Sequence, residues 1–180
     1  RSISWRNELA ELGAMRDRIN LAREKVGVTQ AVLDSINGLA DSFMSALAGA
    51  RSAEHGAELL RGTAAGAMSS LQDLLNTTYD GQYVFGGLNG TSAPLVPYQG
   101  SAGELAFSVM FNGTFGFGQG DPQLSDVNTQ QMESFLSGPF GDLFEAGSWP
   151  ILWTGAAQQL PAVRLGPNHT VTASVSASAP

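Results

Sequence analysis

Cysteine is absent from this 180-residue sequence, and basic residues are scarce. Without cysteine the chain can form no disulfide, no thiolate metal site and no cysteine nucleophile. Nine basic residues stand against sixteen acidic ones, which gives a net charge of −7. Because phosphate groups and anionic membrane surfaces are bound by clustered lysine and arginine, this charge argues against nucleic acid and membrane as partners.

Long apolar runs are also missing. No stretch reaches the roughly 18 consecutive apolar residues that a membrane-spanning helix needs. Charged residues make up 14% of the chain, well below the roughly 25% of ordinary soluble domains. Residues 1–5 lack the apolar core of a signal peptide, so we expect a secreted form of this protein to carry its signal elsewhere or to use another export route.

No motif indicates catalysis, a cofactor or a metal. The two histidines, His55 and His169, have no partners at metal-ligand spacing, and we expect solvated or structural roles for both. The glycine-rich run 116–120 lacks the spacing and the lysine of a phosphate loop, and no G-x-S-x-G elbow occurs. We therefore predict no enzyme, no cofactor and no metal site. No spacing favours an acid–base pair among the carboxylates of the second half, which are Glu104, Asp121, Asp126, Glu133, Asp142 and Glu145.

Composition divides the sequence near residue 80. Eight of the nine basic residues lie at or before Arg61, whereas all eight prolines lie at or after Pro94. Twelve of the fifteen aromatic residues follow Asp80. The first half is therefore typical of helix, and the second half of turn-rich structure. We predict a mainly α protein with small β content (α+β), built from a helical rod over residues 1–87 and an outer mixed α/β lobe over residues 88–180.

Residues 3 to about 51 carry an almost unbroken heptad pattern. Counted in sevens from Trp5 and again from Glu8, twelve of fourteen positions are apolar. Seven heptads without proline predict one continuous helix, roughly 70 Å long at about 1.5 Å per residue. So long a seam cannot all be buried within 18.8 kDa. We assign packing and assembly to the seam residues Trp5, Leu12, Met15, Ile19, Val26, Leu33, Ile36, Phe43 and Leu47.

A second helix is expected from about residue 53 to 77. A short connection makes it an antiparallel neighbour of the first helix, and its length covers about half of that helix. The remaining half must then contact a later segment, a segment outside this sequence or another subunit. Residues 79–87 follow as a short β-turn segment, because Asp80-Gly81 is a turn signal and residues 82–85 are β-like.

The outer lobe is expected to mix short helices with a hairpin whose last strand returns toward the rod. Trp149 and Trp153 could form a sugar-binding platform, although we favour packing in the core. The expected elements are a helix over 102–117 with a turn at Asn112-Gly113, a helix from an N-cap at Asp126 to residues 135–136, a helical turn over 140–144, a strand over 149–153, and a hairpin of residues 162–165 and 170–176 around the turn 166–169.

One stretch resembles a known family. Residues 74–87 read LLNTTYDGQYVFGG, which resembles the motif that ends the second rod helix of flagellin-family proteins, in particular the hook-associated proteins of the hook–filament junction. The block GPFGDLFE at 138–145, with the two tryptophans that follow it, and the tail TVTASVSA at 170–177 are similar to the alphaproteobacterial branch of those proteins. The motif residues are Asp80, Gly81, Tyr83, Phe85, Gly86 and Gly87.

This resemblance implies a structural, extracellular subunit of the bacterial flagellum that acts in motility and is exported by the flagellar secretion apparatus. It further implies self-assembly into a ring of copies, with a neighbouring hook-associated protein below, flagellin above and an export chaperone before assembly. The family architecture also has terminal helices and a returning C-terminal helix, which we expect to lie outside residues 1–180. Two alternatives stay open, the filament-forming flagellin itself and an extracellular binding or hydrolytic lobe carried on a helical stalk.

Overall fold

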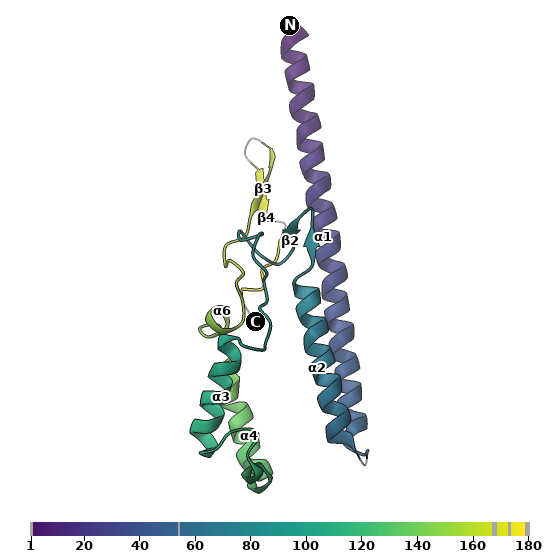
Figure 1. Ribbon diagram of the computed structural model, residues 1–180. Coiled ribbons are helices and arrows are strands. Elements are labelled where there is room, and N and C mark those ends of the chain that lie inside the picture. Colours follow the sequence, from purple (N-terminus) through teal and green to yellow (C-terminus); the bar gives the residue numbers. More distant parts are fainter. Residues whose placement is uncertain (1, 54, 167–168, 173, 179–180) are drawn as a thin grey trace.

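The computed structural model describes residues 2–53, 55–166, 169–172 and 174–178. Helix α1 (Ser2–Ala50) runs without a break for 49 residues, as the heptad pattern predicted. Helix α2 (Gly56–Leu75) has 20 residues and returns along the second half of α1, so the first half of α1 extends beyond it as a single helix (Figure 1). Among the described residues, no helix combines the length and the apolar character that crossing a bilayer requires.

The turn between the two helices is longer than the sequence suggested. Helix α2 was expected from residue 53, but it begins at Gly56. The N–H groups of Ser52 and Ala53 instead donate to the carbonyls of Gly49 and Ala50, both at 3.3 Å. These bonds tighten the end of α1 before the chain reverses, which delays the start of the next helix.

A buried cluster lies where α1, α2 and the segment after them meet. Its members are Val32 of α1, Val84 and Phe85, and Ala177 from near the end of the described chain. Half-buried apolar residues of both helices pack around it, so this one cluster joins residues that are almost 150 positions apart in sequence. The surrounding residues are Val28, Ile36, Leu74, Leu75, Tyr79 and Ala156.

A small hairpin follows α2. Strands β1 (Thr78–Tyr79) and β2 (Gln82–Tyr83) pair antiparallel around Asp80-Gly81, both of which have positive φ angles of 51° and 74°. A two-residue turn with two positive φ angles suits the twist of a hairpin, and Asp-Gly is favoured in it. The predicted turn is therefore confirmed. The β-like run is shorter than expected, because after Tyr83 the chain turns to bury Val84 and Phe85.

The outer lobe holds short helices, several of which differ from the expectation. Helix α3 (Ala102–Phe115) passes through Asn112-Gly113 without the predicted turn and ends at Gly116, whose φ of 82° is a left-handed helix stop. A 3₁₀ turn, η1 (Pro122–Asp126), precedes α4 (Thr129–Ser137), so the predicted N-cap at Asp126 is wrong. Helix α5 (Pro139–Asp142) confirms the helical turn that was expected near Phe140.

The segment of the two tryptophans is a helix and not a strand. Helix α6 (Trp149–Leu152) has Pro150 in its first turn, where proline's fixed φ and missing N–H are tolerated. The helical spacing also places Trp149 near Trp153, with their ring centroids 6.4 Å apart. Both rings contact the Phe144 ring in the aromatic core of the lobe.

The predicted hairpin near the end of the chain is present but shorter. Strand β3 (Ala162–Gly166) pairs antiparallel with β4 (His169–Thr172), with Val163 opposite Val171. The second strand was expected to reach residue 176, but β4 ends at Thr172, and Ser176 forms a separate bridge with Gly86. The predicted turn includes residues 167–168, which lie outside the described residues. Over the residues that the structure describes, the result is a mainly α fold with two small antiparallel strand pairs, as expected.

Candidate assembly surface

The first half of α1, which extends beyond α2, exposes large apolar side chains. Trp5 is 64% exposed, Leu9 67%, Leu12 56% and Ile19 36%. Monomeric soluble proteins rarely leave contiguous apolar patches uncovered, and such patches mark interaction surfaces. The seam was expected to be under-covered at Leu12, Ile19 and Val26; this is confirmed for Leu12, whereas Ile19 is only partly covered and Val26 is half-buried, both beside hairpin β3–β4. We call these four residues the exposed row.

The other seam residues lie at different depths. Ile36, Phe43 and Leu47 are half-buried on the side toward α2, whereas Leu33 is 39% exposed. Met15 and Val26 are half-buried. On a straight α-helix a strict seven-residue row drifts around the helix axis by about 20° per heptad. The seam row that starts at Trp5 therefore begins away from the side of α1 that faces α2, and it reaches that side only near Leu47.

The most buried apolar side chain of α1 was not among the predicted seam residues. Val32 is 7% exposed, and Thr29, one turn before it, is 5% exposed and donates its hydroxyl to the Lys25 carbonyl at 2.8 Å. A stripe with the true helical spacing, through Val28, Val32 and Leu39, would have indicated this face. The seven-residue count concealed this face because, on a straight α-helix, a strict seven-residue row drifts around the axis and does not follow one side.

Hairpin β3–β4 lies beside α1 and forms the wall of an apolar groove. The groove has a volume of about 380 Å³, and Val163 and Val171 face it from the hairpin. From α1 it is lined by Ile19 and Val26, so it is continuous with the exposed row. An apolar groove at the end of an apolar row can accommodate the side chains of a further helix or strand. Its remaining lining residues are Ala22, Arg23, Gly27 and Gln30.

The motif residues after the β1–β2 hairpin hold three segments together. The N–H of Val84 donates to the Thr77 carbonyl at 2.9 Å, and the Phe85 carbonyl accepts from Ala177 at 3.0 Å. The Gly86 carbonyl accepts from Ala157 at 3.1 Å. A side chain at Gly87 would place its Cβ 2.4 Å from the Ala157 carbonyl oxygen, so the close approach requires glycine. In this structure the motif joins the rod to the outer lobe.

A side-chain contact fixes the β1–β2 hairpin on α1. The Tyr79 hydroxyl donates a hydrogen bond to a carboxylate oxygen of Glu24. This hydrogen bond raises the pKa of Tyr79, with smaller contributions from desolvation and from the negative charges of Glu24 and Asp80. The contact lies on the part of α1 that extends beyond α2, and it joins the β1–β2 hairpin to that helix.

Trp149 and Trp153 pack among the aromatic side chains of the lobe. The Trp153 ring stacks on those of Tyr98 and Phe144, at interplanar angles of 8° and 7°. Its indole N–H donates to the Leu143 carbonyl at 2.7 Å, and that of Trp149 donates to the Ala177 carbonyl at 2.8 Å. Sugar platforms need an open ring face, so this geometry favours the packing role.

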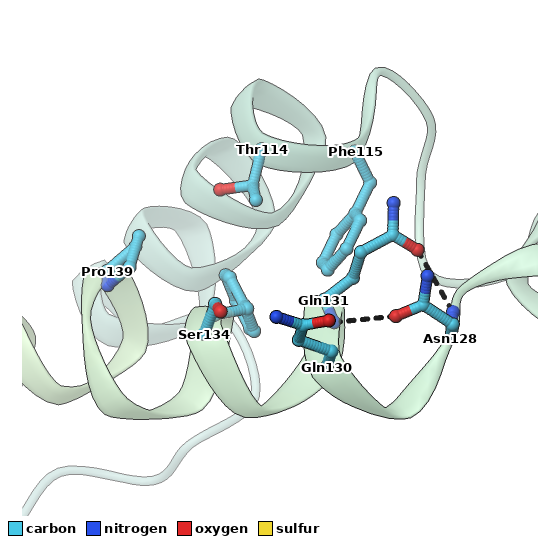
Figure 2. Close-up of a pocket in the computed structure, with 8 residues that line it drawn as sticks. Thr114, Phe115, Asn128, Gln130, Gln131, Ser134 and Pro139 are labelled. Atoms are coloured by element: carbon cyan, nitrogen blue, oxygen red, sulfur yellow. Dashed lines mark hydrogen bonds between the residues drawn. The ribbon is translucent and has the colours of Figure 1, made fainter.

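A second hollow lies between α3 and α4, and Figure 2 shows the residues around it. Its volume is about 460 Å³, and its lining carries amide, hydroxyl and phenyl groups but no titratable side chain. Asn128 accepts from the Gln131 N–H at 2.9 Å, and Gln131 accepts from the Asn128 N–H at 3.0 Å. This capping box uses the two amide oxygens for the start of α4. The arrangement is explained by helix capping.

Within the described ranges, no three histidine or carboxylate side chains come together as a possible metal site. His55 precedes the first turn of α2 without a capping hydrogen bond from its side chain, and His169 begins β4.

Comparison with known proteins agrees with this geometry. The family model described as the bacterial flagellin N-terminal helical region matches residues 1–90, which include α1, α2, the β1–β2 hairpin and the motif. No curated protein and no solved structure matches the chain. The matched region covers half of the sequence and contains the exposed row, and proteins of this family are structural parts of the flagellum. The chain belongs to the flagellin family.

Proposed function

We propose that this protein is the subunit that joins a hook-associated protein to the flagellin filament. The observation that carries the proposal is the exposed row on the first half of α1, within the region that matches the family. Four large apolar side chains remain in water in the single chain. Covering them gains free energy at about 25 cal/mol per Å² of apolar surface, so the rod is suited to association.

The second half of the chain supports the junction role over the filament role. The block at 138–145 and the tail at 170–177 resemble the junction proteins and lie outside the matched residues 1–90. Both contribute to the fold. Phe140 and Phe144 stand in the aromatic cluster with their ring centroids 5.1 Å apart, and Ala177 lies in the buried cluster of the rod.

On this proposal, function is mechanical. Copies of the subunit form a ring, their helices cover one another's exposed rows, and the two ends of the ring contact different neighbours, a hook-associated protein and flagellin. An export chaperone would protect the apolar row before secretion. None of these steps requires a catalytic residue, a cofactor or a metal.

Deletion of the gene from a flagellated host tests the junction role. A junction subunit is needed to hold the filament, so the deletion strain should export flagellin into the medium, assemble hooks without filaments and lose motility. Restoring the gene should restore the filaments. A deletion strain that swims with normal filaments would contradict the proposal, and a strain that exports no flagellin would indicate the filament subunit instead.

The exposed row is tested in the same host with complementing variants. Leu12→Gln and Ile19→Gln replace apolar groups of the row, and both should reduce the number of filaments. Leu59→Gln is the matched control, because Leu59 is 65% exposed but lies on α2, outside the row. Equal loss of filaments with all three variants would show that the row has no special role.

Filament-forming flagellin remains the second candidate, since the matched family region is that of flagellin. Purified full-length protein distinguishes the two roles. A filament subunit polymerises into long filaments without other proteins, whereas a junction subunit is expected to stop at small oligomers. Electron microscopy of the concentrated protein gives the answer.

A further inference from the structure

Three Asn-Gly dipeptides occur in the sequence, at Asn37-Gly38, Asn89-Gly90 and Asn112-Gly113. All three asparagine side chains are exposed, so access to water does not distinguish them. Their backbones do. Asn37 lies inside α1 and Asn112 inside α3, whereas Asn89 lies in the irregular segment between the motif and the outer lobe.

Asn-Gly is chemically labile because of its backbone nitrogen. The amide nitrogen of the glycine, after losing its proton, attacks Cγ of the asparagine. The bond from Cγ to the side-chain nitrogen breaks, ammonia leaves and a five-membered succinimide ring forms. Water then opens either carbonyl of the ring, giving aspartate or isoaspartate. Glycine permits this closure because it has no Cβ to obstruct the approach.

The state of the attacking nitrogen separates the three sites. In a helix the N–H of the glycine is held in the i to i−4 hydrogen-bond ladder, and ring closure must first open that ladder. Among the described residues, no acceptor receives the N–H of Gly90; only its carbonyl is bonded, accepting from Tyr83 at 2.8 Å. We propose that Asn89 is a site of spontaneous deamidation, and that its conversion loosens the join between the motif and the outer lobe.

The second part follows from the bonds around Asn89. Its side-chain amide donates to the Gly155 carbonyl at 3.2 Å. A carboxylate at this position has no proton to donate and repels that carbonyl. The same two segments are joined by the Leu88 N–H to the Gln159 carbonyl at 2.9 Å and by the Ala157 N–H to the Gly86 carbonyl at 3.1 Å.

Isoaspartate disturbs the join further. It adds one carbon to the main chain, because the backbone then passes through the former side chain. The Asn89 carbonyl oxygen already lies so close to Gly86 that a Cβ there would meet it at 2.8 Å. A longer chain cannot keep this turn, so the bonds to residues 155–159 open.

The test is to age the purified protein in warm, mildly alkaline buffer and to follow each asparagine by peptide mass spectrometry. Chymotrypsin is needed, because no lysine or arginine separates Asn89 from Asn112. Asn89 should convert roughly tenfold faster than Asn37 and Asn112, since those two must first lose helix hydrogen bonds. In urea the three rates should become similar. Equal deamidation rates of the three asparagines in the folded protein, or a slower rate at Asn89, would contradict the proposal that Asn89 is the preferred site.

Substitution of the glycine after each asparagine tests whether ring closure at Asn89 depends on Gly90 while the fold is unchanged. Gly90→Ala should slow the conversion at Asn89 while the fold is kept, because its new Cβ would lie 3.4 Å from the Gln82 side chain, an ordinary contact. Gly113→Ala is the matched control and should leave Asn89 unchanged.

The predicted weakening of the bonds between residues 86–89 and 155–159 is tested with Asn89→Asp, which introduces the negative charge of the deamidated product directly. Hydrogen exchange at residues 86–90 and 155–159 should become several-fold faster than in the wild type. Asn112→Asp, which adds the same charge on α3, should leave these amides unchanged. Unaltered exchange in Asn89→Asp would contradict the loosening.

Discussion

Gly56 lies where the chain enters α2, close against the backbone at the end of α1. A Cβ at this position would lie 1.9 Å from the Ala50 carbonyl oxygen. Since that atom belongs to the backbone at the end of α1, a side chain could be accepted only by moving one helix away from the other.

We therefore expect Gly56→Ala to lower the free energy of unfolding by roughly 2 kcal/mol or more, as overpacking does. Gly62→Ala is the matched control, because a Cβ there meets nothing within 4 Å inside α2. In a helix interior, alanine is favoured over glycine by about 1 kcal/mol, so this variant should be more stable than the wild type. Urea unfolding measures the free energy of unfolding of both variants. Equal changes in the two variants would contradict the close contact between Gly56 and the end of α1.

Tyr79 gives a second prediction at this scale. The neutral phenol is the donor to Glu24, and its pKa in the folded state is raised above the ordinary value. The stabilisation is therefore fully present below the unfolded pKa of about 10, and it is lost as the pH rises through the folded pKa. Tyr79→Phe should be slightly less stable than the wild type at neutral pH, and the difference should vanish in strong alkali.

The measurement is the unfolding free energy of both proteins across this pH range, together with a double-mutant cycle that includes Glu24→Gln. The cycle isolates the pair from the other effects of each substitution. A stability difference that stays constant into strong alkali would mean that the hydroxyl bond is not its source.

At the scale of single elements, the start of α4 shows what local sequence could and could not predict. Asp126 and Asn128 are both residues that cap helices. Only Asn128 has a glutamine three residues later, and the Asn128–Gln131 pair forms the capping box. That spacing was present in the sequence, so the correct cap could have been predicted. Asp126 instead ends the preceding 3₁₀ turn.

Asn128→Ala should reduce the stability of the lobe by about 1 kcal/mol, the usual cost of losing an N-cap. Asp126→Ala removes a polar side chain two residues earlier and should cost much less. Trp149 and Trp153 lie in the aromatic core of the lobe, so tryptophan fluorescence during urea unfolding reports on this region. The cap would be in doubt if both variants lost the same stability.

The tryptophan segment shows the opposite case, in which short-range sequence could not decide. Residues 149–153 are large and apolar, and a run of this length is compatible with a strand or with one helical turn. What decides the outcome is distant. Trp153 needs both Tyr98 and Phe144 beside it, and Trp149 reaches the Ala177 carbonyl. Such contacts depend on the packed lobe and are not encoded within five residues.

At the scale of the whole molecule, a comparison of lengths was more informative than any motif. A 49-residue helix beside a 20-residue helix leaves more than half of its length without that helix as a partner, whatever the details of packing. Which side of α1 is covered could not be predicted from the seven-residue count. The seven-residue seam runs from Leu12, which is 56% exposed, to the half-buried Leu47, and the position of α2 along the helix decides where burial begins.

The two halves of α1 should also differ in stability. Residues 29–50 pack against α2 and the buried cluster, whereas residues 5–20 extend beyond α2, meet hairpin β3–β4 only near Ile19, and include Gly13. Helices without tertiary packing are only marginally stable in water. We therefore expect amide hydrogen exchange in the single chain to be much faster over residues 5–20 than over residues 29–50.

Association should reverse this difference, because a partner that covers the exposed row stabilises the helix beneath it. Exchange over residues 5–20 should then slow as the protein assembles, while exchange over residues 29–50 changes little. Gly13→Ala provides the control, since a Cβ there meets nothing within 4 Å and the change should slow exchange in the single chain through helix propensity alone. If residues 5–20 were already as protected as residues 29–50 in the single chain, the exposed row would need no partner to stay helical, and stabilisation of α1 by assembly would be contradicted.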